Sequence, residues 1–148
     1  MKRILLFTAM LMIAFGAFAQ YIDLGLPSGT KWKKTSEKGF YTYDEAMAEF
    51  ATQLPSYAQL EELRDFCTWT WMESGCKVVG PNGNFIYLPA AGRRDCDGDV
   101  DLVSYSGSYW SSTPSGSAGA YYLVFLFGKV GVNYSGRCYG QSVLLVQN

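Results

Sequence analysis

Two helix-start signals early in the chain constrain its fold most strongly. Thr42 is followed three residues later by Glu45, and Ser56 by Gln59. Each pair forms a capping box, the pattern that begins many helices, and apolar residues at helical spacing follow both. From Cys67 onward, short runs of alternating apolar and polar residues are typical of strands. We therefore predict an α+β domain in which two short helices flank a mainly antiparallel sheet.

Turn residues separate the expected strands. Pro81, Asn82 and Gly83 predict one hairpin turn, and Gly128 predicts another. Residues 92–108 show little periodicity and are expected to form a loop. The expected strands are 21–24, 31–35, 68–71, 78–79, 85–88, 109–113, the two arms of 120–135, and 141–146. We expect the four tryptophans to pack in the core and not to stack on sugar rings.

The first nineteen residues have the pattern of a secretory signal peptide. Lys2 and Arg3 precede an apolar run, and Ala17-Phe18-Ala19 supplies a small-x-small cleavage pattern. The apolar run is short for a retained membrane anchor. We therefore expect residues 20–148 to form one domain that is exported to the periplasm, the cell surface or the medium, with no retained membrane span.

The composition argues against most enzyme classes and against nucleic-acid binding. Histidine is absent, which excludes Ser-His-Asp triads and His-based zinc sites. Removing Lys2 and Arg3 from the twelve basic residues leaves ten, against thirteen acidic ones, and the basic residues are scattered. The acidic residues of the two helices lie at caps and surface positions, where they are common without catalysis. We predict a protein that is not an enzyme, that needs no cofactor and that has no nucleic-acid partner.

Residues 104–142 have the composition of a recognition surface. They include nine Ser, seven Gly, six Tyr and one Asn, and only Lys129 and Arg137 are charged. Antibody binding loops use the same residues, because Tyr offers rigid contact area and Ser, Gly and Asn offer adaptable hydrogen bonds. Leu123 and Phe125 alternate as core-facing strand residues do, which a flexible linker would not require. The predicted ligand contacts are Tyr122, Asn133, Tyr134, Ser135, Arg137 and Tyr139, with Tyr105 and Tyr109 as further candidates.

An acidic loop precedes this segment. Asp95, Asp97, Asp99 and Asp101 alternate, which invites calcium, but their spacing does not match an EF-hand loop. We expect a solvated acidic loop and no metal site. Arg137 is equally suited to a structural ion pair with this loop.

The four cysteines predict disulfide bonding in an exported protein. No C-x-x-C pair supports zinc, and four cysteines allow three pairings. We prefer a bond between Cys96 and Cys138, since both border the predicted ligand segment. Cys67 and Cys76 are the remaining candidates, and a partly reduced set stays open.

Several motifs occur together in the order found in a known family. They are YIDLGLPSGTKW, LPSYAQLEEL, CTWTW, GPNGN-x-I-x-LPAAG, YWSST, A-x-x-L-x-F and RCYGQSV. The chain resembles the Fibrobacter succinogenes major paralogous domain, an exported family abundant in gut Bacteroidetes. The resemblance covers essentially all of residues 20–148. One departure is Leu144-Leu145 after QSV, where members commonly carry Arg-Pro or Arg-Leu.

The resemblance implies a C-type lectin-like fold, similar to that of formylglycine-generating enzymes and of the variable proteins diversified by retroelements. In that fold the terminal strands pair, two helices flank the sheet, and a second small sheet carries the ligand loops. It implies a monomeric, non-catalytic module that binds a glycan or a surface protein through its variable C-terminal region. Two alternatives stay open. One is an oxidoreductase of the formylglycine-generating type, although only Cys138 lies late in the chain; the other is a cell-surface assembly protein.

Overall fold

Two capped helices form where the sequence predicts them. The computed structural model describes residues 20–148, so the predicted signal peptide at 1–19 lies outside the described residues. Helix α2 spans Tyr43–Phe50, α3 spans Tyr57–Phe66, and the 3-10 turn η1 (Ala51–Gln53) joins them. Both capping boxes are formed by side-chain and backbone hydrogen bonds. Within residues 20–148, no helix has the length and apolar character needed to cross a bilayer.

The strands confirm the α+β class, since every pair within the sheets is antiparallel. One sheet has the order β1-β2-β11, a second β3-β4-β5, a third β8-β9-β10, and β6-β7 is a two-stranded ribbon. The bounds are β1 Tyr21–Asp23, β2 Lys31–Lys33, β3 Thr68–Met72, β4 Gly75–Val79, β5 Phe85–Pro89, β6 Arg93–Arg94, β7 Val100–Asp101, β8 Ser106–Ser115, β9 Gly119–Leu126, β10 Lys129–Gly136 and β11 Val146–Gln147.

Two expectations about the sheets need correction. The terminal strands β1 and β11 share a sheet but do not pair directly, because β2 lies between them and pairs with both. Residues 92–108 are not a plain loop, since they hold the β6-β7 ribbon and the start of β8. Two-residue strands are too short to produce a periodic pattern, which is why the sequence does not reveal this ribbon.

Core side chains pack on both faces of the β8-β9-β10 sheet. On one face, Leu123 and Phe125 join a cluster that includes Leu60 and Leu63 of α3. On the other face, Trp110 joins a cluster formed with α2 and the segment before β11. The tryptophans confirm their predicted core role: Trp32 and Trp110 are fully buried, while Trp69 and Trp71 pack against Phe125.

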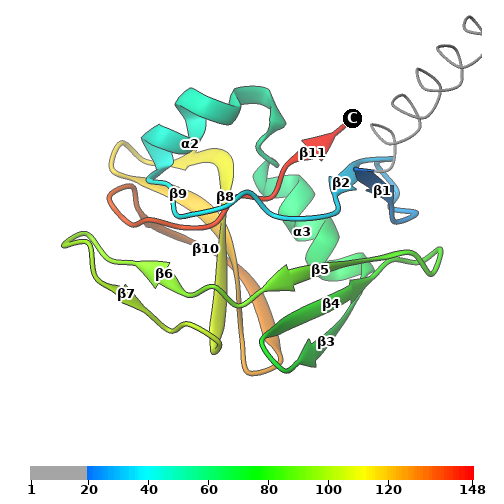
Figure 1. The fold of residues 1–148 in the computed structure, drawn as a ribbon. Coiled ribbons are helices and arrows are strands. Elements are labelled where there is room, and N and C mark those ends of the chain that lie inside the picture. Colours follow the sequence, from blue (N-terminus) through cyan, green and yellow to red (C-terminus); the bar gives the residue numbers. More distant parts are fainter. Residues whose placement is uncertain (1–19) are drawn as a thin grey trace, which may run out of the picture.

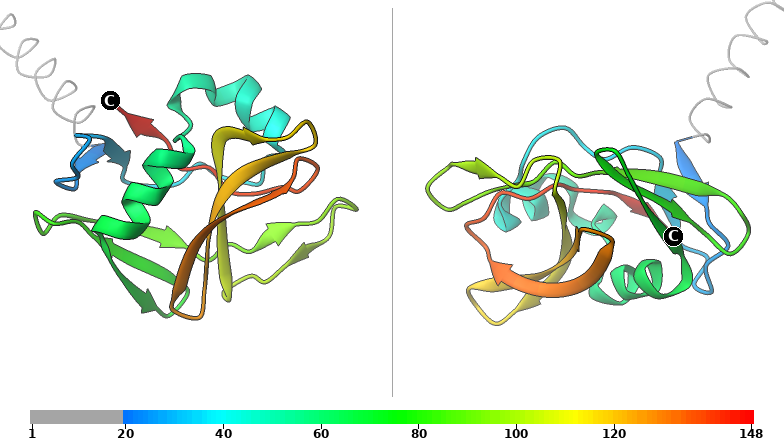
Figure 2. Two further views of the ribbon diagram at one scale, coloured as in Figure 1. Left: turned by 180° about the vertical axis from the view of Figure 1, so that it is seen from behind. Right: turned by 90° about the horizontal axis from the view of Figure 1, so that it is seen from below.

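Core packing covers the middle of both faces, and the exposed residues of β10, Lys129, Asn133 and Tyr134, lie toward its two ends. At one end, the β8-β9 loop lies beside the segment that follows β10, and the Arg137 backbone N–H donates to the Ala118 carbonyl there. The β9-β10 turn, at Phe127 and Gly128, lies at the opposite end (Figures 1 and 2). The sheet therefore offers two separate surfaces for recognition, one at each end.

Candidate functional site

The register of the β9-β10 hairpin divides the predicted contact residues between two faces. Tyr122 lies opposite Asn133, and Tyr121 lies opposite Tyr134. Successive strand residues point to opposite faces, so Tyr134 does not share a face with Tyr122 and Asn133. The strand also continues to Gly136, so Tyr134 lies within β10 and not in the following loop. The predicted set therefore does not form one surface.

Tyr134 belongs to a row of three tyrosines on one face, which we call the tyrosine row. Its side chain is 66% exposed, and its ring meets Tyr121 edge-on with the centroids 6.4 Å apart. Tyr121 in turn contacts Tyr57, the first residue of α3, at 4.6 Å. Desolvation and then the nearby Glu61 carboxylate raise the pKa of the Tyr57 hydroxyl. The row presents apolar rings with polar tips.

A groove of about 410 Å³ adjoins the tyrosine row. It is lined by Tyr134, Ser135 and Gly136 from β10 and by residues 115–119 of the β8-β9 loop. No charged side chain lines it. Of the predicted contacts, the structure brings Tyr134 and Ser135 together here, and it adds Tyr57 and Tyr121, which the sequence analysis missed.

Arg137 holds the loop that forms this groove. Its Nε donates to the Gly119 carbonyl and its Nη2 to the Gly116 carbonyl, each at 3.0 Å. The guanidinium also lies over the Tyr43 ring, 4.8 Å from the centroid. Arg137 therefore supports the loop. These contacts are neither the ligand contact nor the ion pair with the acidic loop that were expected of it. Near the acidic loop, Arg93 Nε lies 3.6 Å from Asp101 Oδ1 in a partly exposed ion pair.

The other predicted tyrosines on the opposite face are partly buried. Tyr122 packs edge-on against Trp110, with the centroids 6.2 Å apart. Burial raises the pKa of Tyr122, and the nearby Arg93 opposes that effect. Tyr139 lies under the Arg93 guanidinium at 4.9 Å and joins the same cluster. Asn133 is exposed there, with its Oδ1 accepting from the Tyr134 backbone N–H at 2.8 Å.

Tyr109 and Tyr105 do not belong to the candidate surface. Tyr109 is only 1% exposed, stacks on Phe125 and donates its hydroxyl to the Pro89 carbonyl at 2.7 Å. Its prediction as a ligand contact is wrong, because the β8 alternation turns it into the core. Tyr105 is exposed, but it lies at the opposite end of the sheet, where its ring meets Phe127.

One of the expected disulfides is present. Cys96 and Cys138 are bonded, which confirms the preferred pair, whereas Cys67 and Cys76 are free. The cysteines thus form the partly reduced set that the sequence left open. Burial raises the pKa of both free thiols to about 11, so almost none of either is thiolate at neutral pH.

The acidic loop is closed by its own backbone. The Asp95 carboxylate accepts from the backbone N–H groups of Asp97 and Asp99, at 2.9 and 3.0 Å. Within residues 20–148, no three carboxylate or thiol side chains converge as metal ligands would. The Asp95 side chain thus caps the turn at residues 95–99.

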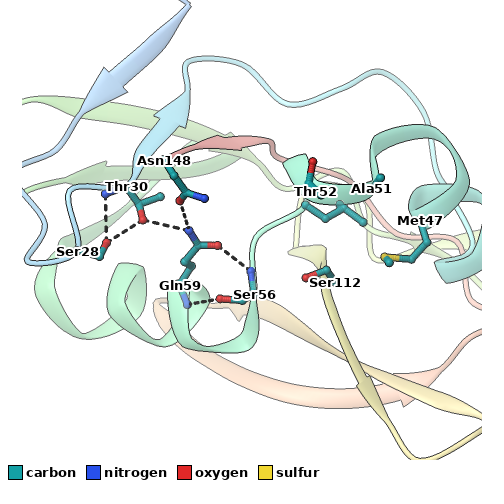
Figure 3. A pocket seen from close by; sticks show the side chains of 10 residues that line it. Ser28, Thr30, Met47, Ala51, Thr52, Ser56, Gln59, Ser112 and Asn148 are labelled. Atoms are coloured by element: carbon teal, nitrogen blue, oxygen red, sulfur yellow. Dashed lines mark hydrogen bonds between the residues drawn. The ribbon is translucent and has the colours of Figure 1, made fainter.

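A larger cavity, of about 770 Å³, lies between the α2-η1 segment and the start of α3 (Figure 3). Met47 and Ala51 form an apolar side together with the hydroxyl-bearing Thr52, and hydroxyl and amide side chains form the other side. Its lining residues come from four separate parts of the chain, within residues 28–30, within 47–59, and at 112 and 148. No sequence motif indicates this cavity, because its walls come from segments far apart in the chain.

Ala51, in the apolar wall, has a strained backbone with φ 44° and ψ −114°. We expect Ala51→Gly to raise the free energy of unfolding by about 1 kcal/mol, because relief of strain exceeds the entropic penalty of glycine. Ala48→Gly, in the exposed middle of α2, should instead lower it by about 1 kcal/mol. Chemical denaturation followed by circular dichroism measures both. Equal losses in the two variants would contradict a strained Ala51.

Comparison with other proteins adds no relative from which a function is transferred. No family model, no curated protein and no solved structure matches the chain. The tyrosine row, the adjoining groove and the larger cavity are therefore the basis on which its function is argued.

Proposed function

We propose that this chain is an exported binding module without a catalytic role, of the C-type lectin-like type and related to the Fibrobacter succinogenes major paralogous domain. It recognises a glycan or a surface protein through the tyrosine row and the groove beside it. One observation carries this proposal. Tyr134 is 66% exposed, although it belongs to a packed row of rings and borders a groove.

The chemistry of this surface supports recognition. Tyrosine rings offer large contact area with little loss of rotamer freedom, and their hydroxyls accept and donate hydrogen bonds. Tyr57 and Tyr121 support Tyr134 from one side, while Arg137 fixes the β8-β9 loop on the other. A surface that is already ordered loses less entropy on binding. The uncharged groove favours a neutral part of the ligand.

Replacing Tyr134 with alanine is expected to weaken ligand binding at least tenfold, because exposed aromatic anchors often dominate the affinity of such a surface. The protein, expressed from its full sequence, is first tested on a panel of gut glycans and on extracts of bacterial surface proteins. The affinity for the ligand found is then measured by calorimetry for the parent and the variant.

Tyr105→Ala is the matched control. Tyr105 is 56% exposed, similar to Tyr134, but it lies at the opposite end of the sheet. Its replacement should leave the affinity unchanged. If Tyr134→Ala binds as tightly as the parent while remaining folded, the tyrosine row is not the recognition surface.

A second candidate function is assembly at a cell surface, and one observation favours it. Five exposed apolar side chains lie at the end of the sheet that contains the β9-β10 turn and the start of β8: Leu102, Val103, Tyr105, Leu126 and Phe127. Exposed apolar clusters often mark contacts between proteins. Light scattering separates the candidates, since a mass that grows with concentration supports assembly and a constant monomer mass supports a monomeric binding module.

A further inference from the structure

The larger cavity between α2-η1 and α3 shares no lining residue with the groove beside the tyrosine row. Its polar wall consists of a hydrogen-bonded chain that runs from Ser56 through Gln59 to Asn148 (Figure 3). Its apolar wall includes Met47 and Leu54. This cavity is therefore a separate place for a ligand.

The hydrogen bonds fix the orientation of both side-chain amides. The Ser56 backbone N–H donates to the Gln59 side chain at 2.9 Å, so the atom that accepts must be Oε1. The Gln59 Nε2 group then faces two acceptors, the Thr30 hydroxyl at 3.1 Å and the Asn148 side chain at 2.9 Å. Asn148 must present its Oδ1 to Gln59. Its Nδ2 group is left on the cavity side, as Figure 3 shows.

Among the polar groups that line the cavity, the exposed Asn148 amide leaves donors free. Asn148 Nδ2 carries two N–H groups, and none of the hydrogen bonds found in the described structure uses them. Ser56 Oγ accepts from the Gln59 backbone N–H at 3.2 Å, which leaves its own proton available. No charged side chain lines the cavity, so it offers no ionic partner to a charged ligand. An uncharged ligand with an acceptor oxygen fits this wall.

The facing wall requires an apolar group next to that oxygen. Met47, Ala51 and Leu54 line it, and Ala51 is held there in a strained conformation. Strained backbone of this kind gathers at ligand sites more than elsewhere. We propose that the cavity binds an uncharged acyl amide, with its carbonyl oxygen accepting from Asn148 Nδ2 and its alkyl group against Met47 and Ala51.

Acyl amides occur in N-acetylated sugars and in peptides, so two probes distinguish these sources. The full chain, labelled with nitrogen-15, is titrated with N-acetylglucosamine and, separately, with N-acetylalanine methylamide. Glucose, which lacks the amide, is the control. We expect at least one amide probe to shift the Asn148 side-chain resonance saturably and glucose to leave it unchanged. The probe that binds more tightly identifies the source.

Asn148→Asp tests the donor directly. The variant keeps an oxygen toward Gln59 Nε2 but replaces the free donors with an acceptor, so binding of the amide probe should weaken about tenfold or more. Gln147→Ala, on the exposed neighbouring residue, should have no effect. Absence of a saturable shift at 20 mM of either probe, or unchanged affinity in Asn148→Asp, overturns the proposal. Tyr134→Ala should leave this binding intact, so the two sites fail or succeed independently.

Discussion

Replacing Trp110 with alanine is expected to lower the free energy of unfolding by about 4 kcal/mol. The Trp110 side chain is fully buried, and its ring meets Tyr43 at 5.7 Å and Tyr122 at 6.2 Å, edge-on in both cases. Its Nε1 donates to the Tyr41 carbonyl at 2.8 Å. The variant thus loses a large ring that joins α2 to the sheet. It also removes one of two donors to the Tyr41 carbonyl, which still accepts from the Gln141 backbone N–H at 2.8 Å.

Trp110→Phe separates these two losses. The phenyl ring keeps most of the packing but cannot donate, so we expect a loss of about 1–2 kcal/mol. Guanidinium denaturation followed by far-ultraviolet circular dichroism measures both variants without relying on tryptophan fluorescence. Equal losses for Ala and Phe would assign the effect to the hydrogen bond alone, and a loss below about 1 kcal/mol for Ala would contradict a core role for this ring.

The helices could be predicted because their signals are local. Thr42 with Glu45, and Ser56 with Gln59, satisfy the first N–H groups of each helix from within four residues of sequence. The end of α2 was less predictable. Ala51 continues the apolar pattern of the helix, yet it adopts a positive φ as the chain turns into η1. That turn depends on contacts with distant residues.

The tyrosine row was within reach of the sequence. A turn at Gly128 was predicted, and a two-residue turn at Phe127-Gly128 pairs Tyr121 with Tyr134. Reasoning along single strands, without the register across them, did not pair Tyr134 with Tyr121 and overlooked Tyr121. Tyr57 had no such signal, because it reaches the row only through packing of α3 against the sheet.

Contacts between distant segments account for what the sequence did not predict. Arg137 binds carbonyl groups about twenty residues away, and the pattern around it resembles that of any exposed arginine. The larger cavity combines Thr30, Gln59 and Asn148, which are unremarkable polar residues individually. Composition correctly indicated where polar and aromatic residues gather, but the β9-β10 register decides which of them share a surface.

Removing the disulfide by changing Cys96 and Cys138 to serine is expected to lower the free energy of unfolding by about 4 kcal/mol. The bond closes a loop with a sequence separation of 42 residues, and its absence gives the unfolded chain more conformations. The native fold should persist. Two hydrogen bonds of 2.8 Å between the backbones of Arg94 and Gly140 still hold the β6-β7 ribbon against the segment after β10.

Dithiothreitol supplies the control for this prediction. Reduction of the parent, verified by mass spectrometry, should give the stability of the double serine variant, and the reductant should not change the variant itself. Equal stability of the parent before and after reduction would show that the bond contributes nothing. Ligand binding by Tyr134 should survive reduction, because Arg137 and the Gly116 and Gly119 carbonyls fix the groove without the disulfide. Loss of binding on reduction would instead show that the bond between Cys96 and Cys138 is needed to keep the groove in shape.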